Sequence, residues 1–338
     1  MIEKQKTRQA YPSGNKLPKK TIGEKNMIAN MKNIIKRYGD QTVVDHLDLE
    51  VIEGEVLGLL GPNGAGKSTT INMLCGLIDA NEGEITLFGQ KQNARNLEAR
   101  KGLGLVTQDI TLFSELSAKE NLRYIGGLYG LRGSKLDKRV EEVLKFIGLT
   151  DHSKKRPKQL SGGMQRRLNI GCALIHQPKL LIMDEPTVGI DPQSRNHILE
   201  SVKKLAEQGT TIIYTSHYME EVQAVCDRVV IMDMGRVIAE GTVDELIKQA
   251  SHERRVQLTA ITPSPELTKN LEAISGVKQV TLNGNKYTII SNLESGNINR
   301  ITEVAGQHGG IAGISEETAT LEDVFLTLTG KTLRDGGE

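Results

Sequence analysis

Short apolar segments alternate with longer amphipathic segments from residue 27 to about residue 250. Apolar runs too short for helices predict strands at residues 27–34, 42–52, 55–60, 83–88, 103–107, 180–183, 210–215 and 228–232. Helices are predicted after residue 66 and before Gly209, which has the place of a C-terminal cap. Strands that alternate with helices in this way indicate an α/β fold whose mainly parallel sheet is covered on both faces.

The pattern becomes helical between about residues 112 and 174. Ser117 and Glu120 have the spacing of a capping box and predict the start of one helix. Apolar residues at i, i+3, i+4 and i+7 predict a second helix: Val140, Val143, Leu144 and Ile147. A third helix is expected after Ser161. We therefore predict a helical subdomain at about 112–174 within a larger domain at 27–250.

A change of composition near residues 251–253 predicts a linker. The segments beyond it have the order strand, helix, strand, strand, helix, strand, which is typical of a small α+β (ferredoxin-like) unit. A last helix is expected from Thr320, with Asp323 completing its cap and Gly330 ending it. We predict that residues 251–338 form an accessory domain.

Residues 1–26 contain seven lysines or arginines and lack an apolar core segment, which predicts a disordered basic tail. A weak contact of this tail with anionic lipid headgroups is the alternative.

The overall composition is that of an ordinary globular protein and excludes several classes. A net charge of +1, with no Trp and four Phe in 338 residues, argues against a nucleic-acid partner. Three widely spaced cysteines (Cys75, Cys172 and Cys226) indicate free thiols and form neither a disulfide framework nor a zinc cluster. No apolar run approaches the length that spans a bilayer, so work on a membrane would need another polypeptide.

The most informative stretch is residues 57–70, LGLLGPNGAGKSTT. It fits G-x-x-x-x-G-K-[ST] between a predicted strand and a predicted helix. Glycines let the backbone curl its N–H groups toward an anion, and the helix N-terminus adds its positive dipole end. Lys67 is placed to reach the β- and γ-phosphates, and Ser68 to bind Mg²⁺. The predicted phosphate loop consists of Gly61, Pro62, Asn63, Gly64, Ala65, Gly66, Lys67, Ser68 and Thr69.

The apolar strand at 180–183 ends in Asp184 and Glu185. Polar residues at the carboxyl end of a buried strand can meet a ligand, so Asp184 is a candidate for holding Mg²⁺ and Glu185 for orienting or deprotonating a water. Solvated acids at a strand-to-loop junction are the alternative if this pair is taken alone. Together with the phosphate loop, the pair becomes a second component of one site.

Residues 160–165, LSGGMQ, open a predicted helix with Ser161 and two glycines. A capped helix start would explain Ser161, but it would not explain Gly162 and Gly163, because glycines destabilise a helix. The segment therefore predicts a second cradle for an anion.

With these motifs in place, residues 27 to about 241 resemble the nucleotide-binding subunit of an ATP-binding-cassette (ABC) transporter. Six elements occur in the family's order: the phosphate loop, Gln108, the signature at 160–165, Asp184 with Glu185, Asp191 and His217. The signature contains Met164 between its second glycine and Gln165, a form familiar among bacterial exporters. The resemblance implies a P-loop NTPase (RecA-like) core with antiparallel β and α-helical subdomains.

The resemblance also implies a role for each element. Two subunits would sandwich two ATP molecules with Mg²⁺, and Ser161, Gly162, Gly163 and Gln165 of one would complete the site of the other. Tyr38 would stack on adenine, and Gln108 would contact Mg²⁺ and the attacking water. Asp191 would bridge the subunits, and His217 would hold the γ-phosphate and Glu185. Lys67, Gln108, Glu185 and His217 are thus the candidate catalytic residues; Ser68, Gln108 and Asp184 are the candidate metal ligands.

The tail helix at 321–326, LEDVFL, is similar to that of daunorubicin-resistance-type export ATPases. It suggests an ABC-2-type exporter ATPase that is cytoplasmic and bound to the inner face of the membrane through a separate permease. The C-terminal domain would support a dimer or regulate ATP turnover.

A soluble ABC ATPase acting in translation or DNA maintenance is the alternative function, although only one cassette is present and no long coiled coil fits between Gln108 and Ser161. A phosphate-loop kinase would not explain residues 160–165 or His217. Drugs, antibiotic peptides, lipids and sodium all stay open as cargo.

Overall fold

The computed structural model describes residues 26–250, 253–292, 296–317 and 320–330. The basic tail predicted at residues 1–26 lies outside this part of the chain, except for its last residue.

A six-stranded sheet forms the centre of the cassette, in the order β10-β9-β3-β8-β7-β6. Its strands are β3 (Val56–Leu60), β6 (Leu103–Val106), β7 (Leu180–Met183), β8 (Thr211–Tyr214), β9 (Arg228–Asp233) and β10 (Arg236–Gly241). All neighbours are parallel except β10, which pairs antiparallel with β9. The mainly parallel sheet predicted from the alternating pattern is therefore confirmed.

One face of this sheet is covered by an antiparallel sheet and α1 (Lys67–Leu74). That second sheet has the order β2-β1-β4-β5 and consists of β1 (Met27–Tyr38), β2 (Gln41–Ile52), β4 (Glu82–Leu87) and β5 (Gln90–Lys91). The short helix α2 (Leu97–Arg100) follows β5. The other face packs against α5 (Gly162–Leu174) and α6 (Pro192–Glu207).

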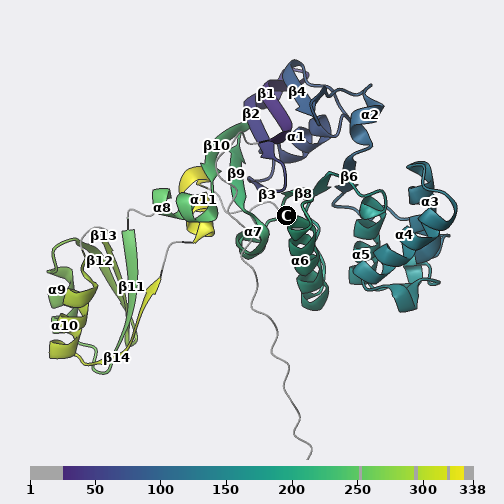
Figure 1. Ribbon diagram of the computed structural model, residues 1–338. Coiled ribbons are helices and arrows are strands. Elements are labelled where there is room, and N and C mark those ends of the chain that lie inside the picture. The colour runs from purple at the N-terminus through teal and green to yellow at the C-terminus, as the bar shows by residue number, and fades with distance from the viewer. Residues whose placement is uncertain (1–25, 251–252, 293–295, 318–319, 331–338) are drawn as a thin grey trace, which may run out of the picture.

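The helical subdomain lies beside the sheet edge formed by β6, as Figure 1 shows. It contains α3 (Ala118–Leu128), α4 (Gly133–Phe146), the short helices η1 (Thr150–His152) and η2 (Pro157–Gln159), and α5. Ser117 and Glu120 form the predicted capping box, and Gly148, at φ 65°, ends the chain segment of α4 in the left-handed conformation. The sequence analysis did not predict α7 (Met219–Val225), α8 (Val243–Ala250) or β10.

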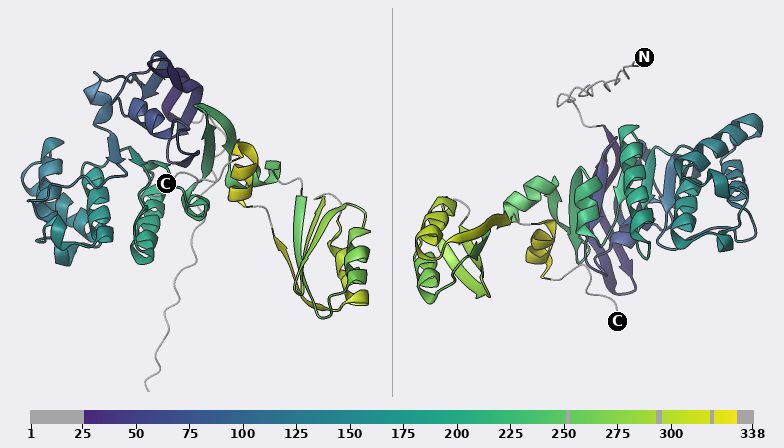
Figure 2. Two further views of the ribbon diagram at one scale, coloured as in Figure 1. Left: turned by 180° about the vertical axis from the view of Figure 1, so that it is seen from behind. Right: turned by 90° about the horizontal axis from the view of Figure 1, so that it is seen from below.

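The C-terminal unit stands apart from the cassette in Figures 1 and 2. It runs β11 (Glu253–Ala260), α9 (Pro265–Glu272), β12 (Val277–Asn283), β13 (Lys286–Asn292), α10 (Ile298–His308) and β14 (Ile311–Glu317). The antiparallel sheet order is β12-β13-β11-β14, and α9 and α10 share its core. This is the ferredoxin-like arrangement that the element order predicted.

The last helix, α11 (Leu321–Thr329), differs from the prediction that placed it with the C-terminal unit. Its apolar stripe (Leu321, Val324 and Phe325) is buried against α7, α8 and β9 of the cassette. The chain thus leaves the cassette after α8 and returns to it at α11, which Figure 2 shows beside α8. The sequence pattern identifies the apolar stripe of α11 but cannot tell which surface will bury it.

Phe325→Ala is expected to lower the free energy of unfolding of the cassette by about 3–5 kcal/mol, because it removes a fully buried aromatic ring and leaves a cavity. Leu328→Ala, at an exposed position of the same helix, is the matched control and should cost less than about 1 kcal/mol. Urea unfolding of both variants, followed by circular dichroism, tests this. Equal midpoints for the two would contradict the packing of α11.

Candidate active site

Four neighbouring parallel strands end at one edge of the central sheet, and each leads into a predicted site segment. The phosphate loop follows β3, His217 follows β8, Asp184 and Glu185 follow β7, and Gln108 follows β6. The strands lie in the order β3-β8-β7-β6, so these segments stand side by side in that order. Carboxyl ends of parallel strands are where open α/β sheets bind ligands.

The phosphate loop has the backbone conformation that its glycines make possible. Gly64 and Gly66 have φ values of 82° and 97°, which disfavour any residue with a Cβ atom. A Cβ atom at Gly61 would lie 2.5 Å from the carbonyl oxygen of Met232. Of the predicted residues in this loop, Asn63, Gly64 and Ser68 are exposed, Thr69 is half-buried, and Pro62 and Ala65 are buried. The loop therefore presents backbone and hydroxyl groups rather than bulky side chains.

Lys67 lies at the first position of α1 and folds back over the loop. Its Nζ donates hydrogen bonds to the carbonyl oxygens of Gly61 at 2.7 Å and Pro62 at 3.2 Å. Burial lowers the pKa of Lys67, while the nearby carboxylates of Glu185 and Asp184 oppose this effect. The lysine is thus a buried cation facing two acids across the edge of the sheet.

Glu185 is held in an unusual conformation between β7 and β8. Its φ is 47°, in the left-handed region that residues other than glycine rarely adopt. Thr215 fixes it, because the hydroxyl of Thr215 accepts a hydrogen bond from the Glu185 N–H at 2.9 Å and donates one to Asp184 Oδ1 at 2.7 Å. Strained backbone of this kind persists where the surroundings impose it, and it clusters at functional sites.

His217 Nε2 lies 2.5 Å from Glu185 Oε1. This hydrogen bond lowers the pKa of Glu185, so the carboxyl group is ionised at neutral pH. Burial has the opposite effect on Asp184: it raises the pKa of that carboxyl group, and the charge of Glu185 adds to the rise. The environments of the two acids therefore shift their pKa values in opposite directions, Glu185 toward the ionised form and Asp184 toward the protonated form, which a bound cation would reverse.

Gln108 and Tyr38 are both exposed. Gln108 lies two residues beyond β6, and Asp184 N–H donates to the carbonyl oxygen of Val106 at 2.8 Å, which joins the two strand ends. Tyr38 is the last residue of β1 and is half exposed, with Lys36 Nζ 5.1 Å from its ring centroid. An exposed aromatic face here is compatible with stacking on a base.

The signature segment opens α5, and Ser161 caps the helix by accepting a hydrogen bond from the Met164 N–H at 3.3 Å. Gly162 faces open space, whereas a Cβ atom at Gly163 would lie 2.0 Å from Ser194 Oγ on α6. Gln165 donates back to the carbonyl oxygen of Leu160 at 3.1 Å. Ser161 and Gly162 therefore form the exposed part of the segment, while Gly163 and Gln165 also serve the fold of their own chain.

Asp191 caps α6 by accepting a hydrogen bond from the Ser194 N–H at 2.9 Å, and it is exposed. In the described part of the chain, no hydrogen bond or ion pair joins residues 160–165 to the phosphate loop.

Three residues that the sequence analysis did not single out connect these segments. Arg166 is buried and donates to the carbonyl oxygens of Thr107, at 2.7 Å, and Gln108, which ties the signature helix to the segment after β6. Thr215 and Glu221 bridge the segments after β7 and β8. Their partners are distant in sequence, so no local pattern could have identified them.

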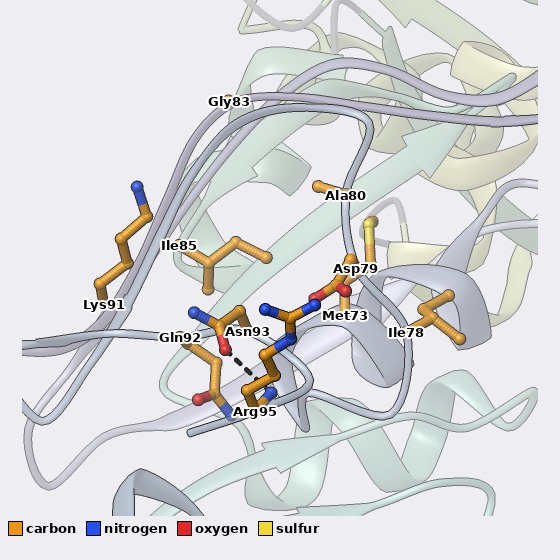
Figure 3. A pocket seen from close by; sticks show the side chains of 10 residues that line it. All are labelled: Met73, Ile78, Asp79, Ala80, Gly83, Ile85, Lys91, Gln92, Asn93 and Arg95. Carbon is orange, nitrogen blue, oxygen red and sulfur yellow. Dashed lines mark hydrogen bonds between the residues drawn. The ribbon is translucent and has the colours of Figure 1, made fainter.

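A cavity of about 320 Å³ lies elsewhere, between the C-terminal end of α1 and the strands β4 and β5 (Figure 3). It is lined by Met73, Ile78, Asp79, Ala80, Gly83, Ile85, Lys91, Gln92, Asn93 and Arg95. None of the predicted site residues is among them. Two of its polar side chains bind the local backbone: Asp79 accepts a hydrogen bond from the Ala94 N–H, and Asn93 accepts one from the Arg95 N–H, as Figure 3 shows for the second contact.

The residues at the sheet edge fit a nucleotide phosphate with a divalent cation. The glycine loop and the start of α1 supply N–H groups, and Lys67 supplies a buried positive charge. Asp184 supplies the carboxylate oxygen, and Ser68 the hydroxyl, that Mg²⁺ prefers. His217 Nδ1 is buried and has no hydrogen-bond partner among the described residues, which leaves a polar atom for a ligand.

Comparisons with known proteins agree with this geometry. A family model described as "ABC transporter" matches residues 44–188. The chain is 44% identical over 307 residues to the linearmycin resistance ATP-binding protein LnrL of Bacillus subtilis (strain 168), covering 90% of this chain and 99% of that protein. This protein belongs to the ABC transporter family. It is similar also to the Nod factor export ATP-binding protein I of Cupriavidus metallidurans, at 40% identity over 91% of this chain and 99% of that protein.

Solved ABC cassettes have the same fold. A structure of an ATP-binding subunit of an ABC transporter has a TM-score of 0.61 at 31% identity and covers 66% of this chain and 92% of that one. A dimeric structure of the ATP-binding cassette MJ0796 bound to ADP and Pi has a TM-score of 0.58 at 29% identity and covers 63% of this chain and 98% of that one. The resemblance and the fold class predicted from the sequence are confirmed.

As a member of this family, the chain binds ATP and is an ATP hydrolase of the ABC transporter type. The similar proteins support the transporter interpretation over a soluble ABC ATPase of translation or DNA maintenance. None of the helices in the described ranges combines the length and the apolar character that crossing a membrane requires.

Proposed function

We propose that this ABC protein powers an ABC-2-type exporter through a separate membrane permease, and that it works as a homodimer which closes on two ATP molecules. The similar resistance and Nod factor export proteins support an export role with a drug-, antibiotic- or lipid-like cargo. One observation carries the proposal. A single chain gathers the phosphate loop, Glu185 and His217 at the carboxyl ends of its central strands, whereas its signature segment at 160–165 begins with the exposed Ser161 and Gly162 on another element.

In this proposal each residue at the sheet edge has one task. The phosphate loop and Lys67 hold the phosphates, and Tyr38 stacks on adenine. Glu185 accepts the proton of the attacking water; the hydrogen bond with His217 lowers its pKa, so the side chain is present at neutral pH as the carboxylate that this role requires. His217 holds Glu185 and turns its remaining ring nitrogen toward the γ-phosphate. Mg²⁺, held by Ser68, Gln108 and Asp184, would neutralise charge on the phosphates.

The dimer supplies what one copy lacks. Ser161, with the N–H groups at the start of α5, would meet the phosphates bound by the other copy, and Asp191 would lie at the interface. A group supplied to phosphoryl transfer by a partner can raise the rate by about 10³–10⁵-fold, so turnover should depend on dimer closure.

The permease would dock on the helical subdomain and so hold the protein at the inner face of the membrane. Phe113 and Tyr124 stack edge to face with ring centroids 4.7 Å apart, and both rings are half exposed. Leu128, on the same helix as Tyr124, is exposed as well. Apolar side chains gathered on an exposed surface indicate an interface.

A cysteine crosslink tests the head-to-tail dimer. Asn63→Cys and Gly162→Cys occupy exposed positions, and Asn63 is preferable to Gly64, whose φ of 82° disfavours any other residue. Combined with Glu185→Gln and ATP·Mg, the two thiols on opposite copies are expected to form a disulfide. Burial raises the pKa values of Cys75 and Cys172 to about 12, so these native thiols should not compete.

The control pairs Asn63→Cys with Glu207→Cys, at the exposed end of α6, and should give no dimer band. Failure of the 63–162 pair under conditions where ATP is bound would contradict the proposed dimer.

A further inference from the structure

A buried acid next to the site has no part in the proposed chemistry. Glu221 lies on α7 and is 3% exposed. Its Oε2 accepts three hydrogen bonds, from Thr187 Oγ1 at 2.7 Å, Tyr214 Oη at 2.8 Å and Ser216 Oγ at 2.8 Å. Its other oxygen, Oε1, lies 3.3 Å from Arg195 Nε on α6. Burying a carboxylate is costly, so this arrangement calls for an explanation.

The three hydroxyl donors come from the two segments that carry the Glu185–His217 pair. Thr187 is two residues beyond Glu185, and Ser216 immediately precedes His217. Apart from the Glu185–His217 contact itself, the link nearest to the pair is Thr215, which joins β8 to Asp184 and Glu185. Glu221 therefore provides a second link between these segments, in addition to the one through Thr215.

We propose that Glu221 is a positioning residue for ATP hydrolysis: by gathering Thr187, Tyr214 and Ser216, it sets the register of Glu185 against His217. The inference rests on the roles proposed above for those two residues. Such positioning affects the rate strongly, because a displacement of about 1 Å in a catalytic group can lower a rate by about 10²-fold.

The surroundings of Glu221 suit a carboxylate, whose Oε2 takes the three hydroxyl hydrogen bonds and whose Oε1 lies in ion-pair range of Arg195 without a hydrogen bond among the described residues. An ionised carboxyl group accepts hydrogen bonds and donates none, which suits three hydroxyl donors on one oxygen and a guanidinium beside the other. Burial raises the pKa of Tyr214 well above its ordinary value, and the charge of Glu221 adds to this, so Tyr214 remains a donor. A glutamine would have to turn its NH₂ group either toward the hydroxyls or toward Arg195, and both orientations lose contacts.

Glu221→Gln is therefore expected to lower kcat for ATP roughly tenfold while KM changes less than about twofold, because among the described residues no hydrogen bond or ion pair joins Glu221 to the phosphate loop. In a Glu185→Gln background, the same substitution should not lower the residual turnover further, because the residue through which it acts is already lost. Steady-state and single-turnover assays on the full chain measure both effects.

Glu55→Gln is the matched control. Glu55 is also a buried acid paired with an arginine, Arg228. It lies directly before β3, at the amino ends of the parallel strands and thus opposite the predicted site. Its replacement should lower the melting temperature and leave kcat within about twofold of the unsubstituted chain.

A milder pair of variants tests the inference even if Glu221→Gln does not fold. Thr187→Val removes one hydroxyl donor at nearly constant volume, whereas Thr187→Ser retains the hydroxyl. We expect kcat to fall about threefold or more in the valine variant and to stay within about twofold in the serine variant.

Two results would overturn the inference. One is a folded Glu221→Gln variant with unchanged kcat. The other is a reduction of kcat by Glu221→Gln that is just as large in the Glu185→Gln background. Glu221 would then act on the stability of the fold and not through Glu185. If Glu185→Gln itself leaves turnover intact, the role of base proposed for Glu185 fails instead, and the crosslink between positions 63 and 162 still tests the proposed dimer separately.

Discussion

Glu185→Gln is expected to leave ATP binding intact and to lower ATP turnover by about 10²–10⁴-fold, which is the usual contribution of a general base. The amide keeps the size of the side chain but cannot accept the proton of the attacking water. The phosphate contacts of Lys67 and the loop are untouched, so nucleotide affinity should persist. Phosphate release measures turnover, and titration with a fluorescent ATP analogue measures binding.

Glu207→Gln, an exposed glutamate on α6, is the matched control and should retain full activity. Because hydrolysis is what reopens the proposed dimer, Glu185→Gln with ATP should also elute from a sizing column as a dimer. Full turnover in Glu185→Gln would remove Glu185 from the role of base and leave the proton acceptor unassigned.

The sequence predicted the parts of the site that depend on local chain geometry. Gly64, Gly66 and Lys67 act within one turn between a strand and a helix, and that turn is encoded by consecutive residues. The same holds for the Ser161 cap of α5. Parallel strands then bring the separate segments to one edge, which follows from the alternating pattern of strands and helices.

What the sequence did not predict depends on contacts between distant residues. The left-handed conformation of Glu185 is imposed by Thr215, which is 30 positions away, and Glu221 meets Thr187 across 34 positions. Periodicity reports which face of a helix is apolar and says nothing of the partner, so α11 was predicted with the wrong neighbour.

Two variants that are each inactive as homodimers are expected to regain ATPase activity when mixed. Lys67→Met disables the phosphate loop and leaves the signature intact. Gly162→Glu keeps the phosphate loop but places an acidic side chain where the partner's phosphates would meet the signature. Gly162 faces open space and lies at the first position of α5, where an acidic residue favours the helix, so this substitution should not harm its own fold.

The reason for the rescue is the reciprocal arrangement of the two sites. In a symmetric dimer each site combines the phosphate loop of one copy with the signature of the other. A mixed dimer of the two variants therefore has one doubly defective site and one intact site. Random pairing makes half of the dimers mixed, so an equal mixture should reach about a quarter of the unsubstituted activity if the sites act independently.

The measurement is phosphate release from the two variants separately and after co-refolding or subunit exchange at equal concentration. A single chain carrying both substitutions, mixed with Lys67→Met, is the control and should stay inactive, because neither site of that mixed dimer has a working phosphate loop. Activity of Gly162→Glu alone would show that the signature of one copy does not serve the nucleotide of the other. An inactive mixture in which the mixed dimer is demonstrably present would mean that hydrolysis at either site requires both sites to be intact. The crosslink between positions 63 and 162 would then decide whether the copies face each other head to tail.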